Sequence, residues 1–172
     1  MKSRYTDTDA AEFIARYAHT PGCNEDIALR VYTSRLLGSD GALVLHGGGN
    51  TSVKTLLRDD TGALVDVLCV KGSGWDLDTL EPRGLPAVRM DSLVRLRERD
   101  ALSDEDMVNA QRTRLLDASA PNPSVETLLH AFLPATFIDH SHADAVLALA
   151  NQPNSAELCR EVFGDTLAIV PY

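Results

Sequence analysis

The chain has 172 residues, of which 44% are hydrophobic and 24% charged, and 25 acidic against 16 basic side chains give a net charge of −9. This length and composition are typical of one globular domain and exclude a largely disordered chain. The acidic balance and the lack of a long basic stretch disfavour a nucleic-acid partner, because phosphate backbones are bound by clustered Lys and Arg.

Cysteine usage and the N-terminus bear on the compartment. Cys23, Cys69 and Cys159 are far apart and odd in number, which indicates reduced thiols that pack as small apolar side chains. The segment MKSRYTDTDAAEF lacks the apolar centre of a signal peptide, and no run approaches the ~18 apolar residues of a membrane span. We therefore expect a cytoplasmic protein without a membrane partner.

The first third of the chain predicts two helices and a strand. Apolar side chains recur at helical spacing over 8–19 and 24–37, with Asn24 as the N-cap of the second helix and Gly38 at its end. The run ALVLHGG (42–48) predicts a strand that leads into a glycine-rich turn.

A β-hairpin follows. SVKTLLR (52–58) and ALVDVLCV (63–70) are its predicted arms, and DDTG (59–62) has the residues that a tight turn needs. A small-residue loop, KGSGWD (71–76), comes directly after the second arm.

The second half of the chain alternates further helices and strands. Ser103 and Ser124 are expected to cap helices, and Pro134 to end the second of these. The predicted elements are helices over 103–117, 124–133, 143–151 and 155–164, and strands over 136–140 and 167–172. This order indicates an α/β fold with helices on both faces of a sheet that is not all parallel. The last strand pattern ends abruptly, so we expect residues 1–172 to be a single domain that lacks its C-terminal portion.

The stretch FIDHSHAD (137–144) contains two of the five histidines. In a strand, residues i and i+2 point to the same face, so His140 and His142 project side by side and both imidazoles can reach one Zn²⁺ at ~2.0–2.1 Å. A polar strand end is the alternative. His19, His46 and His130 are the other candidate ligands, since a catalytic zinc usually has three protein ligands.

The segment PNPSVETLLHAFL places an acid, Glu126, at the second position of the helix that Ser124 is expected to cap. There the carboxylate can simply complement the helix dipole. Because the spacing is not that of a capping box, Glu126 is also free to act as a proton-transfer base beside a metal.

Two glycine-rich loops, HGGGNTS and KGSG, fit neither the Walker pattern nor the dinucleotide fingerprint. They are either ordinary tight turns or anion sites, in which Asn50, Ser73 and Ser124 add side-chain donors to the backbone amides. Lys71 is expected to be a solvated surface lysine.

Four segments in one order, GGGNTSVK, VKGSGWDL, NPSVETLLHAFLP and FIDHSHADAVLALAN, resemble the class II aldolase/adducin family. More narrowly, they resemble the N-terminal aldolase half of bifunctional rhamnulose-phosphate aldolase/short-chain dehydrogenase proteins. The resemblance runs from about residue 25 to the end of the chain. It implies a three-layer α/β/α sandwich around a mixed, largely antiparallel sheet, incomplete here at its C-terminus, and assembly as a homo-oligomer, commonly a tetramer.

The resemblance also implies roles for individual residues. His140 and His142 match two of three histidines that hold a divalent metal, usually zinc, and Glu126 matches the acid that moves the proton at the ketose-phosphate carbon. Gly49, Asn50, Ser73, Gly74 and Ser124 match the phosphate-binding residues.

The implied reaction is metal-dependent cleavage of a ketose 1-phosphate, such as rhamnulose 1-phosphate, to dihydroxyacetone phosphate and an aldehyde such as lactaldehyde. NAD enters only if a dehydrogenase domain lies downstream, since these residues contain no dinucleotide fingerprint. The alternatives are a sugar-phosphate 4-epimerase on the same fold and a non-catalytic, adducin-like interaction module.

Two positions depart from the family pattern. Val125 stands where many single-function members have a second serine, which removes one phosphate donor. The family's third metal histidine is expected beyond residue 172, so this chain by itself is expected to bind zinc weakly and to be inactive.

Overall fold

A computed structural model describes residues 2–170. Its strands are β1 (Asn50–Arg58), β2 (Leu64–Val70), β3 (Ala87–Arg89) and β4 (Phe137–His140). Its helices are α1 (Asp7–Tyr17), α2 (Glu25–Gly38), α3 (Met90–Arg95), α4 (Asp104–Arg112), α5 (Thr127–Phe132), α6 (Asp144–Ala150) and α7 (Ser155–Phe163). Single turns of 3₁₀ helix occupy Pro82–Gly84 and Leu96–Glu98.

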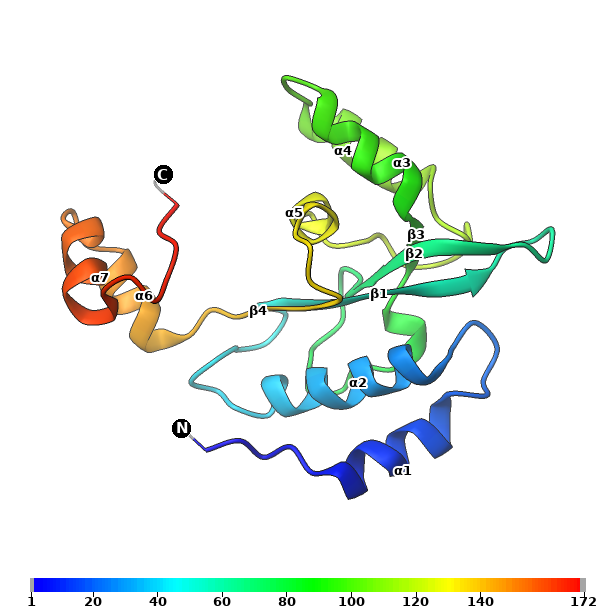
Figure 1. The fold of residues 1–172 in the computed structure, drawn as a ribbon, viewed down its shortest axis with the longest axis horizontal. Helices are drawn as coiled ribbons and strands as arrows, with labels where there is room; N and C mark the ends of the chain where they lie inside the picture. The colour runs from blue at the N-terminus through cyan, green and yellow to red at the C-terminus, as the bar shows by residue number, and fades with distance from the viewer. Residues whose placement is uncertain (1, 171–172) are drawn as a thin grey trace.

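The four strands form one sheet in the order β3-β2-β1-β4, and each of the three ladders between them is antiparallel. α1 and α2 lie on one side of the sheet, while α3, α4 and α5 lie on the other side (Figure 1). The predicted α/β/α layering and the antiparallel character of the sheet are confirmed.

Both faces of the central strands are buried, which explains why β2 reads as a continuous apolar run. Val67 and Cys69 belong to the cluster beneath α2, whereas Leu68 and Val70 belong to the cluster beneath α3 and α5. All four side chains are fully buried. The sheet is therefore the buried middle layer, and the polar residues Asn50 and His140 lie at its end.

Side-chain caps define the helix starts that the sequence predicted. Asn24 Oδ1 accepts from the amide of Ile27 at 3.0 Å, and Ser103 Oγ accepts from the amide of Asp106 at 3.1 Å. The helix that Ser103 begins ends at Arg112 and not at residue 117. It ends early because the following chain pairs with β3 through the amide of Leu116.

The strand predicted over 42–48 is wrong. The amides of Leu43 and Val44 bond back to the Asp40 carbonyl, which bends this segment into a turn. The carbonyl of Leu43 then accepts from the amide of His142 at 2.9 Å, so the loop is held beside the predicted metal ligands.

Two further differences concern the ends of the prediction. β3 and α3, in the stretch between 77 and 102, were not predicted. Residues 167–170 of the predicted closing strand have no regular structure, and its last two residues lie outside the described range. Within residues 2–170, none of the helices has both the length and the apolar character needed to cross a membrane.

Candidate active site

The alternation of β1 delivers polar side chains to the two faces of the sheet. Asn50 and Ser52 point toward the α5 layer, where Ser52 Oγ lies 2.7 Å from His130 Nδ1. Thr51 points the other way, and its hydroxyl lies 2.7 Å from that of Ser34 on α2. Asn50 thus reaches the α5 side at the very end of the strand, next to the edge of the sheet.

His140 ends β4 directly opposite Asn50 in the antiparallel ladder. Asn50 Nδ2 lies 3.1 Å from His140 Nδ1. His142 follows beyond the strand, and its ring centroid lies 4.8 Å from that of His140. The two imidazoles are therefore neighbours, as the sequence predicted.

Glu126 lies beside the same group. Its Oε2 accepts from Asn50 Nδ2 and from Ser124 Oγ, each at 2.5 Å, and its Oε1 lies 3.7 Å from His140 Nδ1. Strand β1, strand β4 and the start of α5 each contribute one member of this polar cluster.

The predicted start of this helix is wrong. Ser124 does not cap it; α5 begins at Thr127, and Glu126 is its N-cap residue. The Ser124 hydroxyl donates to Glu126 Oε2 and does not cap the helix. The Ser124 amide donates to the Lys71 carbonyl at 3.2 Å, and Gly72 forms an isolated antiparallel bridge with Pro123. This pairing places the small-residue loop beside Ser124.

The glycine loop lies against the histidines. Gly49 has φ 65°, a left-handed conformation that favours glycine, and a Cβ there would come within 2.6 Å of the His140 carbonyl oxygen. A Cβ at Gly48 would lie 3.3 Å from His142 Nδ1. The absence of side chains therefore allows the loop to pack directly on the cluster.

Lys71 corrects the expectation of a solvated surface lysine, since the residue is 5% exposed. Its Nζ donates to the carbonyls of Gly47, at 3.1 Å, and Trp75, at 2.6 Å, so it ties the two loops together. Burial lowers the pKa of Lys71, and the carboxylates of Asp76 and Glu126 oppose that shift. A buried ammonium group thus lies beside the cavity, where the sequence predicted a solvated one.

These groups share one cavity of about 300 Å³. Of the predicted site residues, all but His140 line it, and His140 adjoins it through Asn50 and Glu126. The lining comprises Gly47, Gly48, Gly49, Asn50, Lys71, Gly72, Ser73, Gly74, Ser124, Val125, Glu126 and His142. A larger hollow of about 670 Å³ beside α4 contains no histidine and none of the predicted residues. Convergent polar groups make the smaller cavity the candidate site.

Electrostatics favour a charged Glu126 beside a neutral His140. Burial acts to raise the pKa of Glu126, but the net effect is a pKa below its ordinary value. The groups that lower it are the hydrogen bond from Ser124, the charge at His140, a backbone hydrogen bond and the Asn50 amide. Burial lowers the pKa of His140, against the effect of Glu126, and His142 lowers it further. An ionised carboxylate and neutral imidazoles are the states suited to metal binding.

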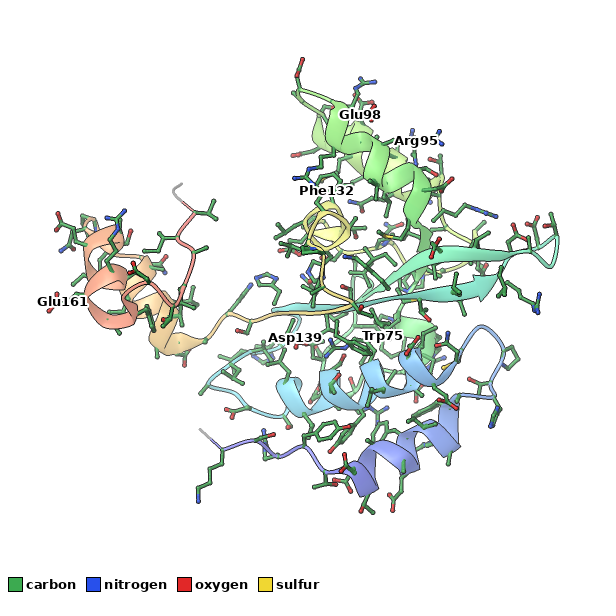
Figure 2. The ribbon with its side chains drawn as sticks, viewed as in Figure 1. Trp75, Arg95, Glu98, Phe132, Asp139 and Glu161 are labelled. Atoms are coloured by element: carbon green, nitrogen blue, oxygen red, sulfur yellow. The ribbon has the colours of Figure 1, made fainter. Side chains whose placement is uncertain are left out.

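Two buried residues support the site: His130, which the sequence offered only as a candidate metal ligand and whose Nδ1 instead lies 2.7 Å from Ser52 Oγ, and Arg30, which was not predicted. His130 is 1% exposed and lies beneath Glu126, one helical turn further along α5. Arg30 from α2 is equally buried and donates to Asp139 Oδ1 at 2.6 Å, on the side of β4 that faces α2 (Figure 2). The Glu-x-x-x-His spacing signals the first of these; the second pairs residues distant in sequence, and no local pattern indicates it.

His140, His142 and Glu126 have the chemistry to bind a divalent metal, but they do not form a complete site. Two neighbouring imidazoles next to a carboxylate are a suitable donor set for zinc. Between residues 2 and 170, however, no group of three or more His, Cys, Asp or Glu side chains is arranged to hold an ion. His140 and His142 are therefore at most two of the three protein ligands usual for a catalytic zinc.

Comparison with known proteins identifies the family. Residues 28–172 match the model of the class II aldolase and adducin N-terminal domain, which covers most of the chain. The chain belongs to this family, and the resemblance seen in its four motifs is confirmed.

Two relatives are longer than this chain, and it matches a part of each. A solved structure, the N-terminal class II aldolase domain of a conserved protein from Thermoplasma acidophilum, is 41% identical and superposes with a TM-score of 0.79 over 96% of this chain and 71% of that one. The Bacillus subtilis (strain 168) protein called "uncharacterized oxidoreductase YuxG" is 40% identical over 142 residues. That match covers 83% of this chain but 21% of YuxG, so this chain spans about a fifth of that relative's length.

Proposed function

We propose that this chain is the aldolase part of a longer aldolase/dehydrogenase enzyme, and that it cleaves a ketose 1-phosphate of the rhamnulose 1-phosphate type. The products are dihydroxyacetone phosphate and an aldehyde such as lactaldehyde. The observation that carries the proposal is that Glu126 and His142 line one glycine-rich cavity, which His140 adjoins beside Glu126.

The cavity has features that suit a phosphate. Gly49 and Gly74 both line the cavity with positive φ, nothing lies within 4 Å of where a Cβ of Gly74 would be, and Ser73 and Ser124 add hydroxyl donors. The buried ammonium of Lys71 gives the cavity a positive charge beside these donors. Together they favour an anionic group even though the chain as a whole is acidic.

The chemistry follows from the position of Glu126. Breaking the C3–C4 bond of the sugar turns the C4 hydroxyl into the aldehyde carbonyl and leaves an electron pair on C3. The ionised Glu126 carboxylate takes up the proton that the C4 hydroxyl loses, and the resulting carboxyl group delivers it to C3; in the reverse direction the carboxylate removes the C3 proton. A divalent cation held by His140 and His142 would supply charge stabilisation to the substrate oxygens that become electron-rich. We take zinc as that cation, with a third ligand from outside the described residues.

The wider context is part of the same proposal. A dehydrogenase that uses NAD would lie elsewhere in the longer protein; the name of YuxG and its greater length support this. Assembly as a homotetramer is expected from the family, and sedimentation of the full-length protein measures it.

The direct test is a retro-aldol assay on the full-length, zinc-loaded protein with rhamnulose 1-phosphate. Glu126→Gln and His142→Ala are expected to lower kcat/KM by about 10²–10⁴-fold, the range for loss of a proton-transfer group. Ser103→Ala, on α4, is the control and should retain full turnover. Wild-type turnover in both site variants would refute the proposal, and an epimeric sugar phosphate as product would instead assign a 4-epimerase.

A further inference from the structure

The donors expected to bind the substrate phosphate are already in use by Glu126. Asn50 Nδ2 and Ser124 Oγ both donate to Glu126 Oε2, each at 2.5 Å. Asn50 and Ser124 are also two of the residues assigned to the phosphate by family resemblance. The hydrogens of Asn50 and Ser124 are therefore needed both by the Glu126 carboxylate and by the substrate phosphate.

Neither donor has a hydrogen to spare. The Asn50 amide has two hydrogens and three acceptors within reach: Glu126 Oε2, His140 Nδ1 at 3.1 Å and Ser124 Oγ at 3.2 Å. The Ser124 hydroxyl has one hydrogen, and it points to Glu126. A phosphate can bind these groups only if the carboxylate gives them up.

The side chains next to this pair of donors do not add a further hydrogen-bond donor there. Asn50 is 3% exposed, and among the described residues its Oδ1 has no hydrogen-bond partner. Val125, between Ser124 and Glu126, has an apolar side chain where a second hydroxyl is common in the family. The carboxylate thus occupies part of the phosphate cradle as an internal anion.

We infer that the substrate phosphate and the Glu126 carboxylate compete for the hydrogens of Asn50 and Ser124, so that phosphate binding releases the carboxylate for proton transfer. This inference rests on the proposed function, because it takes Glu126 as the proton carrier. A carboxylate held by two charge-assisted hydrogen bonds cannot swing toward a substrate carbon without breaking them. The phosphate end of the substrate thereby unlocks the group that acts at its other end.

Inorganic phosphate is the probe, and its dissociation constant is measured by ³¹P NMR on the metal-free, full-length protein at pH 7. Glu126→Ala removes the competitor and is expected to tighten phosphate binding by roughly tenfold. Glu126→Gln removes the charge but keeps an amide oxygen that accepts from the same donors, so its gain is expected to be clearly smaller. Equal gains in the two variants would show charge repulsion alone and overturn the inference.

A double-mutant cycle isolates the shared donors. In an Asn50→Ala background, Glu126→Ala is expected to give much less than its tenfold gain, whereas in a Ser73→Ala background the gain should be retained. Ser124→Ala provides an independent second cycle if Asn50→Ala does not fold. Additive cycles at Asn50 or Ser124 overturn the inference and leave the proposed function standing, while no saturable phosphate binding by any variant overturns both.

Discussion

His130 shows how a single side chain couples the site to the stability of the fold. Its ring is buried between α5 and β1, where its Nδ1 lies 2.7 Å from Ser52 Oγ. Burial lowers the pKa of His130 to about 4, with a smaller contribution from His140 in the same direction. The imidazole is therefore neutral in the folded protein at neutral pH.

This pKa predicts a pH-dependent stability. In the unfolded chain a histidine titrates near 6.5, so the unfolded state binds the proton first as the pH falls. The contribution of His130 is complete above about pH 6.5 and is lost progressively down to about pH 4, by about 3 kcal/mol. Urea unfolding of wild type and His130→Asn between pH 7 and 4.5 tests this: their free-energy difference should shrink as the pH falls. Parallel curves would contradict it.

Lys71 marks the limit of prediction from sequence at the residue scale. A lysine in a glycine-rich loop is usually solvated, and its neighbours in sequence do not reveal the two carbonyls that accept from its ammonium group. One of these belongs to Gly47 in the other loop, so burial of Lys71 depends on a tertiary contact. His140 and His142 were easier: the period of an extended strand predicts neighbouring rings, and the rings are neighbours although β4 ends at His140.

At the scale of elements, α2 is fixed to the sheet by its first cap. Asn24 accepts from the amide of Ile27, and its Nδ2 also donates to Thr55 Oγ1 at 2.9 Å and to the Leu56 carbonyl at 3.2 Å. The cap of α4, Ser103, is exposed, and among the described contacts its hydroxyl makes only the local bond with the Asp106 amide. The two caps are therefore unequal.

This difference gives a matched pair of variants. Ser103→Ala is expected to cost about 1 kcal/mol of unfolding free energy, the usual value for a lost cap. Asn24→Ala loses the same cap and two bonds to β1 as well, so about 2 kcal/mol is expected. Chemical denaturation of both variants measures the difference, and equal losses would show that the bonds to β1 contribute nothing.

Elements were predictable where local signals decided them. The hairpin of β1 and β2 and the start of α2 follow from alternation, turn residues and a cap. The strand expected over 42–48 failed because its amides close a turn on Asp40, and Ser124 does not cap α5, since its hydroxyl donates to Glu126. Both errors come from hydrogen bonds whose partners a periodicity cannot reveal.

At the scale of the whole molecule, the sheet gathers groups from distant parts of the chain. β1 brings Asn50, β4 brings His140, and the chain entering α5 brings Glu126. The site lies at the end of the sheet where β4 leads away toward α6 and α7 (Figure 1). The α/β class was predictable from the order of elements, and the family from the four motifs, whereas the shared hydrogen bonds of Asn50 appeared only once β1 and β4 were paired.

The central claim is that Glu126 moves a proton at the carbon next to the ketone of a phosphorylated substrate. The most direct measurement is deuterium incorporation into dihydroxyacetone phosphate in D₂O, followed by proton NMR with the zinc-loaded, full-length protein. We predict that the wild type exchanges one hydrogen on the hydroxymethyl carbon of dihydroxyacetone phosphate, the carbon that becomes C3 of the sugar. This exchange should be lost in Glu126→Gln while that variant still binds inorganic phosphate. Exchange at the wild-type rate in Glu126→Gln would contradict the account.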